Sequence, residues 1–239
     1  METLIKIFRK LSLVVGYKTY AQCGEDRIME HLCRTIGISN PRYIDIGTNH
    51  PTILSNTYLF YTKGSNGVCI EPSPILAKKI ARKRRRDIVR AIGVGASTSN
   101  EPLSYYVLTA QTMNTFSKED AEQTMSVPEI YGRQKIERVE QIKIIGINDI
   151  LDEYPQYTDI ISIDTEGMDE EIVRAIDFAR HRPKIFCIET VTQNSDNTFY
   201  KNSELINFLK DNGYVVYADT YLNTIFVDRA LWKYGTTIV

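Results

Sequence analysis

Carboxylates lie in or directly after the apolar, strand-like runs of this chain, and their positions could bring them into one site. Asp45 lies in YIDI, Glu71 follows GVCI, Asp164 and Glu166 follow DIISI, and Glu189 follows FCI. In an open α/β sheet, ligands bind outside the carboxyl ends of the strands. Acids gathered there raise one another's pKa and cost stability unless something binds to them. The pattern therefore predicts a crevice lined with carboxylates.

The turn after the first run reads GTNHP, and it indicates which ligand the crevice holds. Gly47 permits a tight turn, and Glu71 follows it by 24 residues, which suits an acid that binds ribose hydroxyls. NAD and FAD require G-x-G-x-x-G for their pyrophosphate, but this turn has one glycine. S-adenosylmethionine, which has no phosphates, fits better. We expect backbone N–H groups and the side chains of Thr48 or Asn49 to hold its carboxylate.

A methyl transfer to oxygen needs a group that removes the acceptor's proton. His50 is one candidate because its ordinary pKa is about 6.5 and it follows the cofactor turn; a packing role is the alternative. Asp164 and Glu166 are comparable candidates, although acids before a helix also cap it. Together with Glu189 they could instead hold a divalent metal ion. A non-catalytic module that binds S-adenosylmethionine or a nucleotide, and a nucleotide-dependent oxidoreductase, remain alternatives to the methyltransferase.

The elements that must position these residues alternate between helix and strand. This alternation predicts a doubly wound, mostly parallel α/β sheet with a C-terminal antiparallel hairpin that adds an edge strand. The expected helices cover residues 22–36, 54–61, 75–83, 168–179 and 204–212, and the expected strands cover 43–46, 67–70, 88–94, 103–108, 141–147, 159–163, 184–188, 214–218 and 224–227.

One domain is expected to span residues 1–239, because a chain of this length can build one sizeable core. Residues 1–40 form its N-terminal helical segment. Residues 97–140 are polar and interrupt the alternation, so we interpret them as an insertion that could cap the acceptor side of the site.

Bulk composition narrows the function classes. The formal net charge of −1 argues against a dedicated nucleic-acid binder. The basic run Arg82–Arg86 is typical of a solvated helix end, with an anionic partner as the alternative. Four scattered cysteines favour reduced thiols in the cytoplasm. Only three histidines occur, none of them close in sequence to a cysteine pair, which argues against a zinc site. No apolar stretch is long enough to span a bilayer, and the oligomeric state is not predictable from these features.

Several motifs resemble those of the FkbM family of S-adenosylmethionine-dependent methyltransferases. They are YAQCGED, YIDIGTNHP, LSNTYLFYTKG, GVCIEPSP, MNTFS, and IISIDTEGMDEEIV followed by IFCIE. The resemblance covers residues 20–230 and implies a seven-stranded class I methyltransferase fold and methylation of a hydroxyl on a sugar, glycan precursor or secondary metabolite. The turn departs from many members, which have a second glycine.

The resemblance also implies roles for individual residues. Asp164 and Glu166 would face the reaction site, and Glu71 would hold the ribose. The full set of expected cofactor-binding residues is Asp45, Gly47, Thr48, Asn49, Glu71, Pro72 and Asp164.

Overall fold

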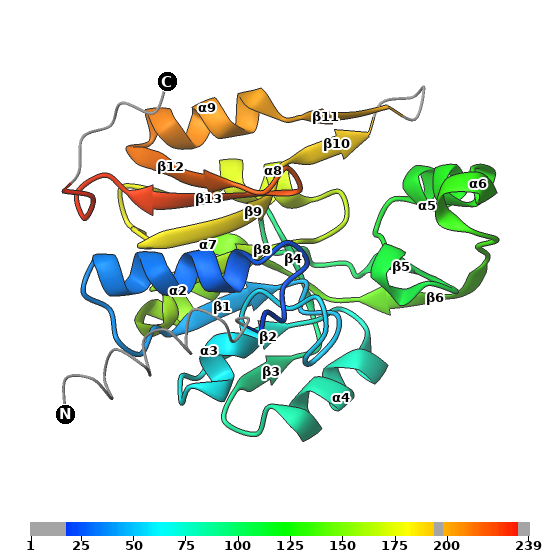
Figure 1. Cartoon of the computed structure of the whole chain (residues 1–239). Coiled ribbons are helices and arrows are strands. Elements are labelled where there is room, and N and C mark those ends of the chain that lie inside the picture. Colours follow the sequence, from blue (N-terminus) through cyan, green and yellow to red (C-terminus); the bar gives the residue numbers. More distant parts are fainter. Residues whose placement is uncertain (1–17, 194–197, 234–239) are drawn as a thin grey trace, which may run out of the picture.

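A seven-stranded sheet forms the centre of the protein (Figure 1), whose computed structural model describes residues 18–193 and 198–233. The strand order is β12-β13-β9-β8-β1-β2-β3. The strands are β1 (Tyr43–Ile46), β2 (Gly67–Ile70), β3 (Ile88–Arg90), β8 (Ile160–Ile163), β9 (Ile185–Glu189), β12 (Tyr214–Asp219) and β13 (Asn223–Asp228). The central strands β1, β2 and β8 are buried along their whole length, as their continuous apolar sequences require.

The predicted doubly wound, mostly parallel sheet is confirmed. The pairs among β3, β2, β1, β8 and β9 are parallel, while β13 is antiparallel to both β9 and β12. The expected hairpin lies at the edge of the sheet, but its antiparallel strand β13 is the inner one. Helix α9 (Ser203–Asp211) connects back to β12, and β13 then turns inward to fill the gap beside β9.

Helices cover both faces of the sheet. Helices α2 (Glu25–Thr35), α3 (Tyr58–Thr62) and α4 (Pro74–Lys83) pack on one face, and α7 (Ile147–Glu153), α8 (Asp169–Arg174) and α9 pack on the other. Each helix buries an apolar stripe, for example Met29 and Leu32 of α2 on the first face and Ile147 and Ile150 of α7 on the second. The two apolar layers hold the strand ends in fixed positions.

Four of the expected elements differ in the structure. The helix expected over 168–179 ends at Arg174. The strand expected over 88–94 is two strands, because β4 (Gly93–Gly95) leaves the sheet and pairs with β7 (Ile144–Gly146). The strand expected over 141–147 is divided between the end of β6 (Ile136–Ile142) and β7. The helix expected from residue 54 begins only at Tyr58, since Leu54 has a left-handed φ of 55° that no helix accommodates.

The polar stretch after β4 protrudes from the sheet (Figure 1). It consists of β5 (Leu103–Leu108) paired antiparallel with β6, the 3₁₀ helix η1 (Gln111–Met113), and helices α5 (Lys118–Ser126) and α6 (Pro128–Tyr131). Its buried cluster is small and consists of Tyr105, Val107 and Ile142 with Phe116 packed against them. We call residues 97–142 the protruding unit.

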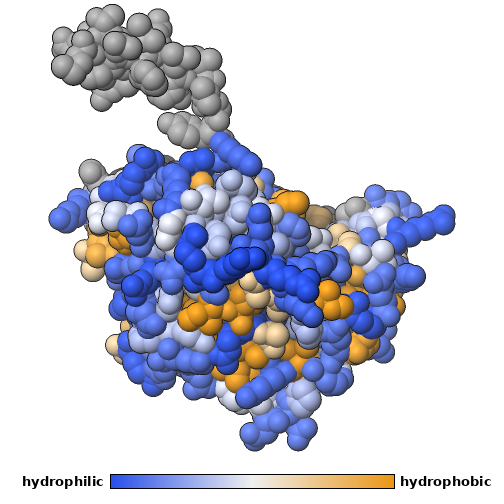
Figure 2. All heavy atoms as spheres, turned by 90° about the horizontal axis from the view of Figure 1, so that it is seen from below, coloured by the Kyte–Doolittle hydropathy of each residue, from blue (hydrophilic) through white to orange (hydrophobic). Residues whose placement is uncertain are grey.

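The remaining short elements are the 3₁₀ helix η2 (Pro155–Tyr157) and the hairpin β10 (Val191–Gln193) with β11 (Phe199–Lys201). The first half of the expected N-terminal helical segment, residues 1–17, lies outside the described residues. Within the described residues, no helix is both long and apolar enough to cross a bilayer. Seen from below, the molecule is largely hydrophilic with hydrophobic groups between the charged ones (Figure 2).

Candidate active site

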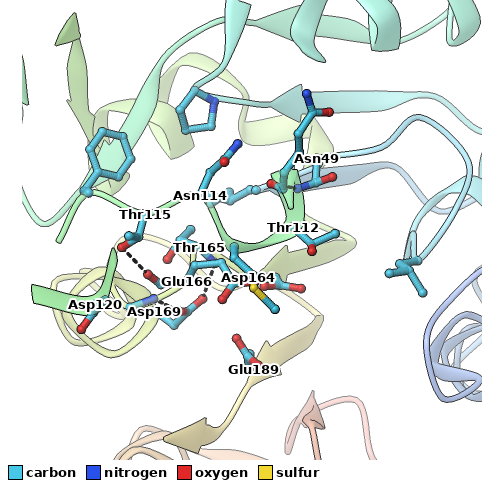
Figure 3. A pocket seen from close by; sticks show the side chains of 18 of the residues that line it. Asn49, Thr112, Asn114, Thr115, Asp120, Asp164, Thr165, Glu166, Asp169 and Glu189 are labelled. Carbon is cyan, nitrogen blue, oxygen red and sulfur yellow. Dashed lines mark hydrogen bonds between the residues drawn. The ribbon is translucent and has the colours of Figure 1, made fainter. Parts of the chain in front are cut away.

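A cavity of about 910 Å³ lies at the carboxyl ends of the central strands. Its walls are the segments that follow β1, β2, β8 and β9, and its outer side is formed by β5, η1 and α5 of the protruding unit. The volume is near the upper end of the range of about 300–1,000 Å³ that is usual for ligand pockets. Figure 3 shows carboxylates from β8 and β9 and amide and hydroxyl groups from the protruding unit around the same space.

Gly47 allows the turns after β1 and β8 to touch. Its φ is 82°, and a Cβ at this position would lie 1.7 Å from the carbonyl oxygen of Asp164. The backbone N–H groups of Gly47 and Thr48 both donate to the carbonyl of Ile70 on β2, at 3.0 and 3.1 Å. Only glycine fits here, so the residue that suggested a cofactor turn is also required for the assembly of the cavity floor.

Glu71 connects the end of β2 to the same turn. Its carboxylate accepts hydrogen bonds from the backbone N–H groups of Asn49 and Ser73, both at 2.8 Å. Burial raises the pKa of Glu71 to about 7, although these two hydrogen bonds oppose the shift. Pro72 lines the cavity beside it. The predicted ribose-binding acid therefore lies in the cavity next to Asn49, as expected of a cofactor pocket.

Asp164, Glu166 and Glu189 bring three carboxyl groups to the cavity without compensation. None of the three accepts a hydrogen bond or pairs with a cation within the described residues. Burial and the other acids raise the pKa of Asp164 to about 7 and that of Glu189 to about 10, and they raise the pKa of Glu166 as well. Such shifts are typical of functional sites.

The turn that carries Asp164 and Glu166 has a strained backbone, and Asp169 stabilises it. Glu166 has a left-handed φ of 54°, which costs energy for a residue with a side chain. Asp169, at the start of α8, accepts hydrogen bonds from the backbone N–H groups of Thr165 at 2.9 Å and Gly167 at 3.4 Å. Asp169 is thus the residue that holds the turn in place.

Two hydrogen bonds join the protruding unit to the two turns. The side-chain amide of Asn49 donates to the carbonyl of Gln111 at 2.8 Å, and the hydroxyl of Thr115 donates to the carbonyl of Glu166 at 3.0 Å. Asn114 lies between them and is buried; its side-chain oxygen accepts a hydrogen bond from the N–H of Leu108 at 2.9 Å. Its amide nitrogen Nδ2 has no partner.

His50 lines the cavity, but its ring accepts hydrogen bonds from the loop in which it lies. Its Nδ1 accepts hydrogen bonds from the backbone N–H groups of Thr52 at 3.1 Å and Ile53 at 2.9 Å. Burial, together with Lys79 and Arg84, lowers the pKa of His50 and favours the neutral ring. A neutral ring whose Nδ1 accepts carries its proton on Nε2, so the exposed nitrogen is a donor. This geometry assigns His50 to the loop rather than to proton removal.

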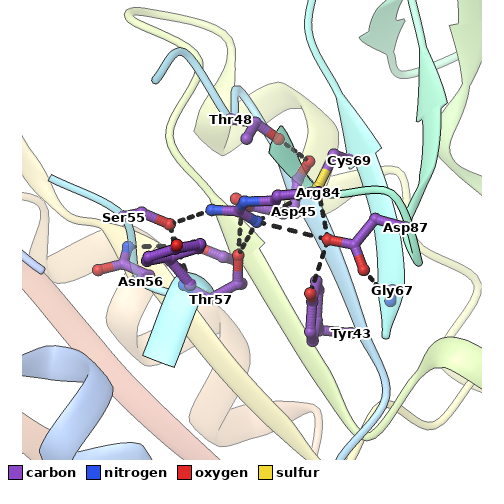
Figure 4. Close-up of polar contacts among 12 residues, drawn as sticks. Tyr43, Asp45, Thr48, Ser55, Asn56, Thr57, Gly67, Cys69, Arg84 and Asp87 are labelled. Atoms are coloured by element: carbon purple, nitrogen blue, oxygen red, sulfur yellow. Dashed lines mark hydrogen bonds and ion pairs between the residues drawn. The ribbon is translucent and has the colours of Figure 1, made fainter. Parts of the chain in front are cut away.

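Asp45 does not line the cavity, which corrects the expectation that it contacts the cofactor. Residues alternate across a strand, and Asp45 points to the opposite face from its neighbours Ile44 and Ile46. There it accepts a hydrogen bond from Thr57 and lies 3.5 Å from Arg84 (Figure 4).

Arg84 is fully buried, although it belongs to the basic run that was interpreted as a solvated helix end. Its neighbours Arg82, Lys83, Arg85 and Arg86 are exposed, so that interpretation is wrong for Arg84 alone. The guanidinium lies 3.5 Å from Asp45 and 3.7 Å from Asp87, and it donates to the carbonyl of Pro51 at 2.7 Å. Arg84 therefore compensates two buried acids and fixes the loop after the cofactor turn.

The lining suits a cationic cofactor. In the described residues the cavity wall contains seven acids and neither lysine nor arginine, so it would repel a pyrophosphate and attract a sulfonium. No three histidine, cysteine, aspartate or glutamate side chains among the described residues are arranged to hold a metal ion. The fit to S-adenosylmethionine rests on this charge and on Glu71, which lies in the cavity beside the Gly47–Asn49 turn.

Eight of the nine predicted site residues line this one cavity, and Asp45 is the exception. The eight are Gly47, Thr48, Asn49, His50, Glu71, Pro72, Asp164, which was predicted for both roles, and Glu166. Sequence reasoning missed Asp169 and Arg84. The spacing of Asp169, four residues after Thr165, is a turn signal that could have revealed the first. No signal distinguishes Arg84 from its four basic neighbours.

Comparisons with known proteins agree with this picture. Residues 45–216 match the model of the methyltransferase FkbM domain. No curated protein matches the chain. Similar solved structures include a TehB-like S-adenosylmethionine-dependent methyltransferase from Corynebacterium glutamicum, with 10% identity, 95% of this chain and 97% of that chain covered, and a TM-score of 0.40. Another is a 1,6-didemethyltoxoflavin-N1-methyltransferase from Burkholderia thailandensis, with 12% identity, 85% and 74% covered, and a TM-score of 0.40.

The structural similarities are distant and carry no inference about chemistry. The family match spans well over half of the chain and includes both turns of the cavity, from Asp45 to Val216. The family expected from the motifs is thereby confirmed: the chain belongs to the FkbM family of S-adenosylmethionine-dependent methyltransferases.

Proposed function

We propose that the protein is an O-methyltransferase that acts on a hydroxyl of a small-molecule acceptor, such as a sugar, a glycan precursor or a secondary metabolite. The observation that carries this proposal is the uncompensated carboxyl group of Asp164, whose pKa of about 7 suits a general base near neutral pH. Asp164 lies in the turn that contacts Gly47, so a base and a cofactor turn are adjacent.

The residues of the cavity divide the work as follows. S-adenosylmethionine supplies an electrophilic methyl group when it is bound. Glu71 would accept hydrogen bonds from the ribose, and the Gly47–Asn49 turn forms the cavity wall beside it. Asp164 removes the proton of the acceptor hydroxyl as the oxygen becomes nucleophilic. Glu166 faces the same space.

The protruding unit is proposed to cap the acceptor side of a single domain. It contributes Asn114, Thr115 and Asp120 to the cavity wall, and it is tied to both turns by hydrogen bonds. The cytoplasm is the proposed location, because all four cysteines are free and three of them are buried thiols, which is usual in a reducing compartment.

Calorimetry with the full chain tests the cofactor, and radiolabelled methyl transfer tests the reaction. We expect S-adenosylmethionine and S-adenosylhomocysteine to bind and NAD not to bind. Glu71→Ala should weaken cofactor binding about 10- to 100-fold, since a hydrogen-bonded charged group is lost. Cofactor binding without methyl transfer to any hydroxyl acceptor would favour a non-catalytic module instead, and binding of NAD alone would refute the proposal.

A further inference from the structure

The acids of the cavity fall into two groups. Some are already satisfied: Glu71 and Asp169 accept backbone N–H groups, and Glu170 pairs with Arg174 at 2.6 Å and accepts from Asn202. Asp164, Glu166 and Glu189 have no such partner in the described part of the chain. Three carboxyl groups therefore face the cavity, and because their pKa values are raised, they ionise fully only when positive charge comes to them.

The cofactor satisfies only part of this need. S-adenosylmethionine has an ammonium, a sulfonium and a carboxylate, so its net charge is +1. One such molecule cannot balance three carboxylates, and the described cavity wall provides no lysine or arginine. The three acids are not arranged as a metal site either. Lys201 acts on Glu189 but is itself paired with Asp219 at 3.0 Å, so further positive charge for these acids would come from another molecule that enters the cavity.

Asn114 is an independent sign that a second molecule enters. It is 4% exposed, and its Nδ2 has no hydrogen-bond partner while its side-chain oxygen is held by Leu108. A buried amide without a partner costs energy unless a ligand supplies an acceptor. Asn114 and Glu189 border the same cavity (Figure 3). A ligand in this cavity would therefore place an oxygen acceptor next to Asn114 and a cation next to Glu189.

Building on the proposed function, we propose that the methyl acceptor is an amine-bearing polyol, such as an amino sugar, whose ammonium group pairs with Glu189 and Glu166. Asn114 donates to one of its oxygens. Acceptors with a phosphate or carboxylate are excluded, because an anion would be placed among uncompensated acids.

The test uses the full chain saturated with S-adenosylhomocysteine and titrated with three probes. These are the methyl glycoside of 2-amino-2-deoxyglucose, its N-acetyl derivative, and methyl glucoside 6-phosphate. The first two share a ring but differ in charge. We expect the amine to bind about 10- to 100-fold more tightly than the N-acetyl probe and the phosphate not to bind. Because Glu189 holds a proton in the free protein, amine binding should release protons, which titrations in two buffers of different ionisation enthalpy detect.

Glu189→Gln should abolish the preference for the amine. Glu170→Gln is the matched control, because it makes the same substitution in the same cavity at an acid that Arg174 already compensates. It should leave the ratio of the two affinities unchanged. Equal or weaker binding of the amine, or an unchanged ratio in Glu189→Gln, would overturn the proposal.

Failure of this proposal can be told apart from failure of the proposed function. If S-adenosylhomocysteine binds and a neutral or anionic hydroxyl compound is methylated, the methyltransferase stands and the acceptor class is wrong. If no probe binds to the loaded protein, the acceptor class is again wrong. If the cofactor itself does not bind, the proposed function fails first.

Discussion

The protein contains two groups of buried acids that lie close together and yet differ in character. Asp45 and Asp87 share the fully buried guanidinium of Arg84 on one side of β1. Asp164, Glu166 and Glu189 lie at or just after the ends of strands of the same sheet, and none of them forms an ion pair within the described residues, although Lys201 acts on Glu189 from a distance. The first group has its compensating cation within the protein. The second group would be compensated only by bound ligands. The compensating cation, rather than the acid, distinguishes a structural carboxylate from a functional one.

Removal of the Arg84 guanidinium should have the largest effect on the free energy of unfolding. Arg84→Met leaves Asp45 and Asp87 buried without a partner, and breaking such a pair costs about 3–5 kcal/mol. We expect the free energy of unfolding to fall by this amount in chemical denaturation. Arg85→Met, at an exposed neighbour, should stay within about 0.5 kcal/mol of the wild type. Equal effects of the two changes would remove the distinction between the groups.

Removal of an acid from the second group should have the opposite effect on stability. Asp164→Asn should lower kcat by about 10²- to 10⁴-fold, which is the usual contribution of a general base. At pH 8 it should stabilise the ligand-free protein by about 4 kcal/mol, because the pKa of Asp164 is raised from 3.8 to about 7 and each unit corresponds to about 1.4 kcal/mol. Kinetics and thermal unfolding measure the two effects. A variant that is both inactive and less stable would show that Asp164 is structural.

The acids of the cavity should make the stability of the ligand-free protein depend on pH. Asp164 and Glu71 have pKa values of about 7 in the folded protein and ordinary values when unfolded. Between about pH 4 and 7 the folded state therefore binds more protons, so stability is highest below this window and falls as the pH rises through it. We expect the Tm of the ligand-free protein to fall from pH 5 to 8.

The cofactor should reverse this trend. Its positive charge favours ionised carboxylates, so the increase in Tm on adding S-adenosylmethionine should grow from pH 6 to 8. An increase that does not depend on pH would mean that these carboxyl groups do not contact the cofactor's charge.

Replacement of His50 should have the smallest effect. His50→Ala removes the acceptor of two backbone N–H groups in the loop, which costs about 1 kcal/mol. We expect kcat/KM to fall less than 10-fold, roughly the effect of this energy, with the acidic limb of its pH profile unchanged. Loss of that limb in His50→Ala, together with its retention in Asp164→Asn, would make His50 the base after all.

Much of the fold follows from local pattern. The buried strands β1, β2 and β5 match their expected bounds, because continuous or alternating apolar residues and a following glycine or acid delimit them. The start of α3 was placed too early, since the left-handed backbone of Leu54 depends on the loop contacts of His50 and Arg84. Such contacts between distant segments are invisible in a single sequence.

The site was predictable to the extent that strand ends determine it. Acids after β2, β8 and β9 converge because parallel strands end at one edge of a sheet. Asp45 was misplaced because it lies within its strand, where alternation turns it to the other face. Arg84 could not be identified, because its burial depends on Asp45 and Asp87, which lie 39 and 3 residues away from it in the chain.

Two hydrogen bonds join the protruding unit to the turns after β1 and β8, and they limit which residues can be substituted at the contact. The contact to Asn49 uses the backbone carbonyl of Gln111, so any residue can stand at that position. The contact to Glu166 uses the hydroxyl of Thr115, so only serine or threonine can replace it. Thr98, at the base of the unit, also accepts a hydrogen bond from the backbone N–H of Gly146 at 2.8 Å, so an exchange of residues 97–142 between relatives has to keep both hydroxyl groups. Acceptor choice can change in such exchanges while the cofactor turn stays the same.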